Sequence, residues 1–147
     1  MKNRLKIYLA GKMSGLSFDE MFNWRNDLKG RLENIASWRE TKVNIINPVD
    51  FYNFEYPQHQ SEIEVEDFDL AHVKSSDVII VNLDGLESSI GTIIELHDAH
   101  YNNKIPVIAF GNKKLYNKLH PWIKNSITRV EKNIDDIVEY MGDFYIL

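Results

Sequence analysis

Residues 76–95 of the chain read S-D-V-I-I-V-N-L-D-G-L-E-S-S-I-G-T-I-I-E. The apolar run over 78–83 predicts a buried strand, the polar residues after it predict a short loop, and the apolar spacing over 91–103 predicts a helix. This order is typical of an open parallel α/β sheet, in which ligands bind at the carboxyl ends of the strands. Glu95 lies in the first turn of that helix, where the positive end of the helix dipole stabilises a carboxylate.

The alternation of strands and helices continues along the chain and indicates the fold class. Ser17 and Glu20 match a capping box, which predicts the start of a helix. Apolar runs and helical spacing predict the remaining elements: strands over 5–10, 43–46, 105–110 and 127–130, and helices over 63–76, 113–124 and 134–141. We expect one α/β domain over residues 1–147, a flavodoxin-like three-layer sandwich with a five-stranded parallel sheet in the order 2-1-3-4-5 and helices on both faces.

The composition narrows the range of functions. A net charge of −5 without a basic block argues against a nucleic acid polymer as partner. The chain has no cysteine, which excludes a thiolate nucleophile and a disulfide framework and fits a cytoplasmic protein. No apolar run approaches the roughly 20 residues of a membrane span, so we expect no membrane partner. The five histidines lack the spacing of metal ligands, and we expect no metal site.

Asp69 is the most unusual carboxylate by periodicity. On the predicted helix over 63–76, the apolar stripe consists of Val65, Phe68 and Val73, with His72 among them. Asp69 lies one turn from Val65 and from Val73, so we expect it within the buried arc. A carboxylate on an apolar face must be paired, hydrogen-bonded or shifted toward its neutral form. The alternative interpretation is a structural aspartate that caps a helix or forms an ion pair.

Three further features lie near the predicted strand ends. Tyr8 is on the first strand, where a buried hydroxyl needs a hydrogen-bond partner. A turn follows that can cradle a phosphate with its N–H groups, although it lacks the glycine patterns of dinucleotide and P-loop sites. The turn consists of Gly11, Lys12, Met13, Ser14 and Gly15. The aromatic and polar segment 50–61 has no period and predicts a functional loop. On the helix after the turn, Arg25 is the one charged residue of the apolar face.

Three motifs together resemble the nucleoside 2-deoxyribosyltransferase family, which includes enzymes that hydrolyse 2′-deoxynucleoside 5′-monophosphates. They are K-I-Y-L-A-G at 6–11, D-L-A-H-V-K-S-S-D at 69–77 and S-I-G-T-I-I-E-L-H-D-A at 89–99, and the resemblance covers roughly the core from residue 5 to 110. The resemblance implies a flavodoxin-like fold, a homodimer or larger homo-oligomer in which a neighbouring subunit completes each site, and catalysis without a cofactor.

The resemblance also implies roles for individual residues. The family's nucleophile is a glutamate four residues after a glycine, which corresponds to Glu95 after Gly91. The aspartate before a leucine in the preceding helix corresponds to Asp69, and the tyrosine that orients the nucleophile corresponds to Tyr8. Contacts from a neighbouring subunit are assigned to His120 and Asn125.

One position departs from the family members that act on free nucleosides. These carry an aspartate six residues before the nucleophile, where this chain has Ser89. The monophosphate hydrolases resemble the chain better here, because a serine can donate a hydrogen bond to a 5′-phosphate that an aspartate would repel. Lys12 would add a positive charge.

The implied reaction is displacement at the anomeric carbon of a 2-deoxyribosyl unit, with a covalent ester on Glu95 and transfer of the sugar to another nucleobase. Hydrolysis of 2′-deoxynucleoside 5′-monophosphates to free base is one alternative. A second is a nucleotide phosphoribohydrolase that releases cytokinin bases, although the P-G-G that precedes G-T-x-x-E in those enzymes is absent. A third is a non-catalytic nucleotide-binding or sensor module. The expected partners are a deoxynucleoside or deoxynucleotide and a nucleobase.

Overall fold

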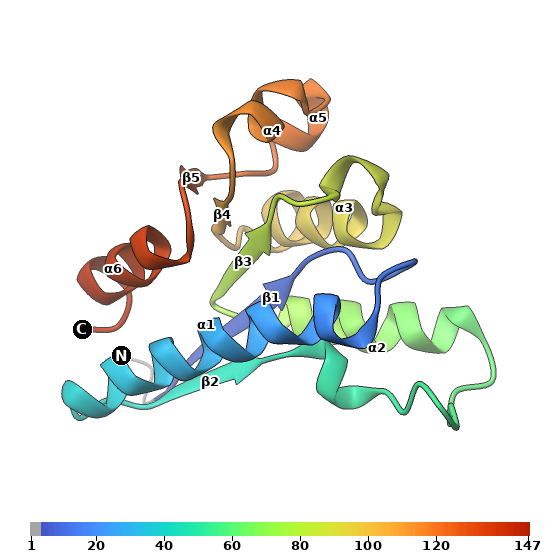
Figure 1. Cartoon of the computed structure of the whole chain (residues 1–147), viewed down its shortest axis with the longest axis horizontal. Coiled ribbons are helices and arrows are strands. Elements are labelled where there is room, and N and C mark those ends of the chain that lie inside the picture. Colours follow the sequence, from blue (N-terminus) through green and yellow to red (C-terminus); the bar gives the residue numbers. More distant parts are fainter. Residues whose placement is uncertain (1–3) are drawn as a thin grey trace.

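The structure, a computed structural model, describes residues 4–147 and contains a five-stranded, all-parallel sheet (Figure 1). Residues 1–3 of the expected domain lie outside the described residues. The strand order is β2-β1-β3-β4-β5, which confirms the predicted fold class and order. The strands are β1 (Leu5–Ala10), β2 (Val43–Ile46), β3 (Val78–Asn82), β4 (Val107–Phe110) and β5 (Arg129–Glu131).

Helices cover both faces of the sheet, so the chain forms three layers (Figure 1). One face packs against α1 (Phe18–Trp38) and α6 (Ile134–Phe144), and the other against α2 (Glu62–Lys74) and α3 (Ile90–His97). The central strands are buried on both faces, because alternate residues of β1 enter opposite cores: Ile7 packs toward α1, and Tyr8 packs toward α3. Tyr8 therefore faces the same side of the sheet as α3.

Most predicted elements are present, with shifted ends. The helix predicted over 91–103 ends as α3 at His97 and continues as a π-helix, η3 (Asp98–Asn102), and the last predicted strand, 127–130, is observed as β5. Short 3-10 helices, η1 (Pro48–Phe51) and η2 (Leu86–Ser88), follow β2 and β3.

The irregular helical segment predicted over 113–124 is observed as two short helices, α4 (Lys113–Lys118) and α5 (Pro121–Lys124). Leu119 leaves the helical conformation and is buried, and Pro121, which lacks an N–H, opens the second helix. The apolar tail 144–147 is only partly buried: Ile146 is in the core, whereas Phe144 and Leu147 are exposed.

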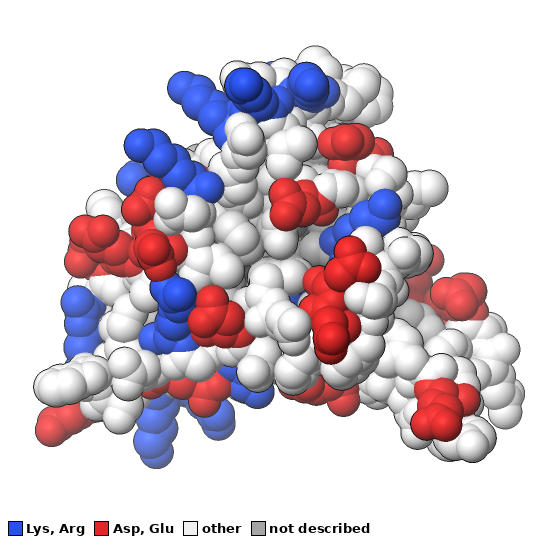
Figure 2. Space-filling view, viewed as in Figure 1, with Lys and Arg blue, Asp and Glu red and all other residues white. Residues whose placement is uncertain are grey.

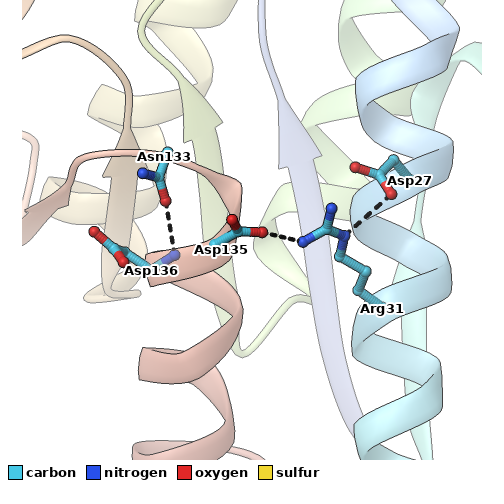
Figure 3. A network of polar contacts seen from close by, with 5 residues as sticks. All are labelled: Asp27, Arg31, Asn133, Asp135 and Asp136. Atoms are coloured by element: carbon cyan, nitrogen blue, oxygen red, sulfur yellow. Dashed lines mark hydrogen bonds and ion pairs between the residues drawn. The ribbon is translucent and has the colours of Figure 1, made fainter.

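An ion-pair network joins the two helices of one layer (Figure 3). Arg31 of α1 bonds to Asp27 one turn earlier and to Asp135 in the first turn of α6. Asn133 caps α6 by accepting from the Asp136 N–H at 2.9 Å. The network lies where α6 packs against α1, on the face of the sheet opposite Glu95 and Asp69. Its ion pairs are exposed, so they contribute little to stability.

Charge is mixed over the face drawn in Figure 2, where basic and acidic side chains are interspersed and a basic group lies over α4 and α5. None of the helices in residues 4–147 is long and apolar enough to cross a bilayer.

Candidate active site

A pocket of about 660 Å³ opens at the carboxyl ends of β1 and β3. The strand order reverses at this point, since β2 lies on one side of β1 and β3 on the other, and such a switch point is where open α/β sheets bind ligands. Five parts of the chain line it: the turn after β1, the first turn of α1 at Met21, the aromatic loop after β2, α2, and the segment from η2 into α3. Segments far apart in the sequence therefore meet at the carboxyl ends of the central strands.

Glu95 lines this pocket and forms a direct pair with Tyr8, which is buried in the core. The Tyr8 hydroxyl, on the α3-facing side of β1, donates a hydrogen bond to Glu95 Oε2. Tyr8 is only 1% exposed, so its ring and hydroxyl are fixed by the core, while Glu95 remains partly accessible from the pocket. The carboxylate is thus held in one orientation with one oxygen engaged.

The environment of Glu95 changes its acidity. Burial raises its pKa to about 8, and the negative charge of Asp69 adds to the rise. The hydrogen bond from Tyr8 and the positive charge of Arg25 act in the opposite direction. Burial and the nearby carboxylates raise the pKa of Tyr8 well above its ordinary value, so this hydroxyl stays protonated and remains a donor.

Asp69 lies across the same pocket on α2 and is partly buried. Its Oδ1 accepts a hydrogen bond from the Tyr52 hydroxyl at 2.5 Å. Burial raises the pKa of Asp69, and the Tyr52 hydrogen bond partly opposes that rise. The expected apolar stripe around Asp69 is only partly correct: Val73 is buried, Val65 is partly buried, and Phe68 is 46% exposed.

The turn after β1 lies on the rim of the pocket. Gly11, Met13, Ser14 and Gly15 line it, whereas Lys12 does not. These five residues lie in one continuous turn after the strand. Lys12 Nζ donates to Ser88 Oγ at 3.0 Å, and Ser88 is itself part of the lining. The positive charge of Lys12 therefore lies next to the pocket and is hydrogen-bonded to a residue that lines it.

Gly85 allows this approach of Lys12. Its φ is +69°, in the region that favours glycine, and a Cβ there would lie 2.7 Å from the Cδ of Lys12. At the start of α3, Ser89 and Gly91 line the pocket, and Ser89 Oγ is 2.7 Å from Thr92 Oγ1.

The two predicted neighbour contacts do not reach the pocket of their own chain. His120 caps α5 by accepting from the Trp122 N–H at 3.1 Å, and Asn125 ends the same helix. Neither lines the pocket, so a role for either requires a second subunit and stays a prediction.

A smaller hollow of about 260 Å³ adjoins the pocket between α2 and α3. Asp69, Gly91 and Glu95 belong to both, while Leu70 and Ile94 line only the smaller one. The two carboxylates therefore stand at the junction of the two hollows.

Sequence reasoning missed the roles of two residues at this site. Arg25 was noticed as a charge on an apolar face, and the structure places it under the strand end that carries Tyr8. Tyr52 lay within the predicted loop, but no periodicity marked it as the partner of Asp69. Within residues 4–147, no group of three or more His, Asp or Glu side chains is placed to hold a metal ion.

Neither a family model nor a curated protein matches the sequence. Solved structures do match over nearly the whole chain. A conserved protein from Enterococcus faecalis has a TM-score of 0.75 at 18% identity, with 95% of this chain and 98% of that chain covered. A 2-deoxyribosyltransferase from Bacillus psychrosaccharolyticus has a TM-score of 0.65 at 21% identity, covering 92% and 91%.

A CMP N-glycosidase from Clostridium botulinum has a TM-score of 0.57 at 15% identity, covering 95% of this chain and 98% of that chain. Structural likeness at such low identity establishes a common fold and does not by itself establish a common activity. The chain thus shares its fold with a 2-deoxyribosyltransferase and with a CMP N-glycosidase.

Proposed function

We propose that the protein is a nucleoside 2-deoxyribosyltransferase-like enzyme, which cleaves the N-glycosidic bond of 2′-deoxynucleosides or their 5′-monophosphates and transfers the sugar to another nucleobase. The observation that carries this proposal is that Glu95 and Asp69 line the same pocket and that the buried Tyr8 donates a hydrogen bond to Glu95. A fixed carboxylate and a second carboxyl with raised pKa are the two groups that glycosidic displacement requires.

In the first step, a Glu95 carboxylate oxygen attacks C1′ of the deoxyribosyl unit while the bond from C1′ to the base nitrogen breaks. The bonding electrons leave with the base, which takes a proton from Asp69. In the second step, another base attacks C1′, the ester bond to Glu95 breaks, and Asp69 receives the proton that the incoming base releases.

The reactive form carries one proton on the two carboxyl groups, and that proton must be on Asp69. Asp69 Oδ1 accepts from Tyr52, which leaves Oδ2 to hold the proton that the base requires. Tyr8 donates to Glu95 and thereby stabilises the ionised nucleophile.

Hydrolysis of deoxynucleoside 5′-monophosphates is the second candidate, supported by the groups near Ser89. Ser88 and Ser89 both line the pocket, and Lys12 is bonded to Ser88, so hydroxyl donors and one cation stand together at its rim. A phosphate would gain charge-assisted hydrogen bonds there.

Release of free base from 2′-deoxynucleosides and their 5′-monophosphates, with and without a second base, tests the proposal by chromatography. A new nucleoside or nucleotide in the presence of the second base indicates a transferase. Base released only from monophosphates, without a new product, indicates the hydrolase. A thermal shift with ligand but no release of base from any substrate contradicts both and favours a binding module.

Substitution Ser89→Asp tests the phosphate contact, with Glu87→Gln, an exposed change in the preceding η2, as control. We expect Ser89→Asp to lose activity on monophosphates by roughly 10-fold or more relative to free nucleosides, because two negative charges would be brought together. An unchanged ratio between the two substrate classes would exclude Ser89 as a phosphate contact.

A further inference from the structure

Arg25 is a fully buried cation that the chemistry above does not use. It projects from α1, is 0% exposed, and its guanidinium centre is 4.5 Å from the centroid of the Trp24 ring. Nη1 donates to the carbonyl of Met21 at 2.7 Å, one turn earlier in the same helix. Among residues 4–147, no carboxylate lies within ion-pair distance of it.

The position of this charge is costly and therefore informative. Burial of a cation that has only neutral partners is unfavourable, and an apolar side chain would complete the stripe of α1 formed by residues such as Met21 and Leu28 at lower cost. Burial lowers the pKa of Arg25 to about 10, so the group stays positively charged at neutral pH. Tyr8 and Glu95 are the groups whose negative forms favour that charge.

Arg25 also forms hydrogen bonds with the end of the strand that carries Tyr8. Nε donates to the carbonyl of Leu9 at 3.3 Å and Nη2 to the carbonyl of Gly11 at 2.9 Å. These carbonyls flank the last residue of β1, so one guanidinium spans the end of the strand and the first residue of the pocket turn.

Gly11 fits closely against this support. A Cβ at Gly11 would lie 2.7 Å from Cζ2 of Trp24 and 3.3 Å from Nη2 of Arg25. The turn therefore lies directly on the side chains of Trp24 and Arg25, and no larger residue can occupy its first position without displacing them.

The charge of Arg25 acts on one of the two carboxyl groups. It lowers the pKa of Glu95 against the effect of burial, whereas the pKa of Asp69 is governed by burial and by Tyr52. Tyr8 on β1 is hydrogen-bonded to Glu95, and the other titratable residues around the two hollows are His59, Glu62 and Glu66. Arg25 is the only cation among the groups that shift the acidity of Glu95 in the described residues.

We propose that Arg25 is a positioning residue of the site: a fixed, buried positive charge that favours the negative charge on Glu95 and braces the strand end that carries Tyr8. The inference rests on the proposed function, since it explains how the nucleophile is kept ionisable. It adds a contribution from the opposite face of the sheet, because α1 and Glu95 lie on different sides of β1.

Three variants of α1 test the proposal through steady-state base release between pH 5.5 and 10. Arg25→Gln removes the charge, and Arg25→Lys retains the charge without the guanidinium that makes the three hydrogen bonds. Lys29→Gln, the control, removes a partly exposed charge of the same helix that pairs with Asp50 at 3.8 Å. We expect Arg25→Gln to lower kcat by roughly 10- to 100-fold at pH 7 with little change in KM. The loss should shrink above the higher pKa that Glu95 has in the variant, because Glu95 is then ionised in both proteins.

Arg25→Lys should keep the pH dependence of the unsubstituted protein, with a kcat reduced by a similar factor at each pH, and Lys29→Gln should match the unsubstituted protein. A loss in Arg25→Gln that is equal at every pH would show a merely structural role and overturn the proposal, as would an unchanged kcat.

If Arg25→Gln does not fold, Arg25→Met, which fills the apolar stripe, replaces it. If neither folds, a pH profile of Arg25→Lys displaced along the pH axis overturns the proposal, and an undisplaced one supports it.

Titration of the Glu95 carboxyl carbon by 13C NMR, assigned with Glu95→Gln, separates this inference from the proposed function. We expect the Glu95 titration to move to higher pH in the neutral variant and to stay in place in Lys29→Gln. This result supports the electrostatic role of Arg25 even if no substrate releases base, in which case only the proposed function fails. A Glu95 titration that is the same in all proteins overturns the inference even if the protein is an active transferase.

Discussion

On the sheet side of the pocket, Glu95 is bonded to a tyrosine that the core holds immobile, whereas on the loop side Asp69 is bonded to a tyrosine of an exposed aromatic segment. Tyr8 belongs to a central strand with neighbours on both sides. Tyr52 lies in a segment whose next aromatic, Phe54, is 49% exposed and contacts Tyr52 edge to face. The two carboxyl groups therefore have the same kind of hydrogen-bond donor on supports of different rigidity.

Under the proposed mechanism, this difference matches two separate tasks of the site. The nucleophile must be aligned with C1′ to within a fraction of an ångström, which a buried strand can ensure. The side of the pocket that protonates the base must also let substrate enter and product leave. Loops that cover a site serve this purpose. We therefore expect changes on the sheet side to act mainly on kcat and changes on the loop side to act on KM and on the choice of base.

Loss of the nucleophile should give the largest effect. Glu95→Gln keeps the size of the side chain and its hydrogen bond with Tyr8 but cannot form the ester, so we expect base release to fall by roughly 10³-fold or more. Mass spectrometry of the unsubstituted protein with a slow substrate should show one deoxyribosyl unit on the peptide that carries Glu95. Near-normal turnover in folded Glu95→Gln would remove the sheet side from the chemistry.

Tyr8→Phe should have the second largest effect. It removes the hydroxyl that orients Glu95 and stabilises its charge, and we expect kcat to fall by about 10- to 100-fold while KM changes little. Tyr116→Phe, on α4 away from the pocket, is a matched control. A change confined to KM would contradict the division of tasks between the two sides.

Tyr52→Phe should have a smaller and pH-dependent effect. Without the hydroxyl, the pKa of Asp69 should rise further, because the hydrogen bond from Tyr52 is the interaction that lowers it. Asp69 then retains its proton to higher pH, so the activity of the variant relative to the unsubstituted protein should increase with pH. We expect a loss of about 3- to 10-fold near pH 7, mostly in KM. Tyr56→Phe in the same loop is the control, and a relative activity that falls as pH rises would contradict this role of Tyr52.

Glu95 should also affect stability, and this is the smallest effect. Its pKa is raised from an ordinary value near 4.5 to about 8 in the folded protein. Between these values the unfolded chain has lost the proton that the folded protein keeps, so this carboxyl destabilises the fold progressively as pH rises. Glu95→Gln lacks this penalty, and its free energy of unfolding should exceed that of the unsubstituted protein by at least about 1 kcal/mol at pH 9 and by less at pH 5. Denaturant titrations at both pH values measure the difference, and a gap that does not grow with pH would show that Glu95 is not held neutral.

The sequence predicted the fold well where burial leaves a clear local signal. The continuous apolar runs of β1 and β3 follow from burial on both faces, and the capping box at Ser17 is observed as predicted. The sequence did not locate the break in the helical segment 113–124, because Leu119 leaves the helix to enter the core, a tertiary preference that helical spacing does not reveal. The same limit applies to Phe68, whose place on an apparent apolar stripe did not make it buried.

The sequence by itself determined the alternation of strands and helices, since this follows from local apolar periodicity. The strand order was expected from the flavodoxin-like topology that such an alternation favours, and the candidate site residues were expected from motifs a few residues long. Only the tertiary structure decided the partners. Tyr8 and Glu95 are 87 positions apart, and Asp69 and Tyr52 are 17 apart. Arg25 appeared in the sequence as an intruder on an apolar face, yet its guanidinium holds carbonyls 14 and 16 positions away. Backbone carbonyls are the same in every residue, so no sequence pattern marks which of them a buried arginine will bind; the packing of α1 against the end of β1 decides it.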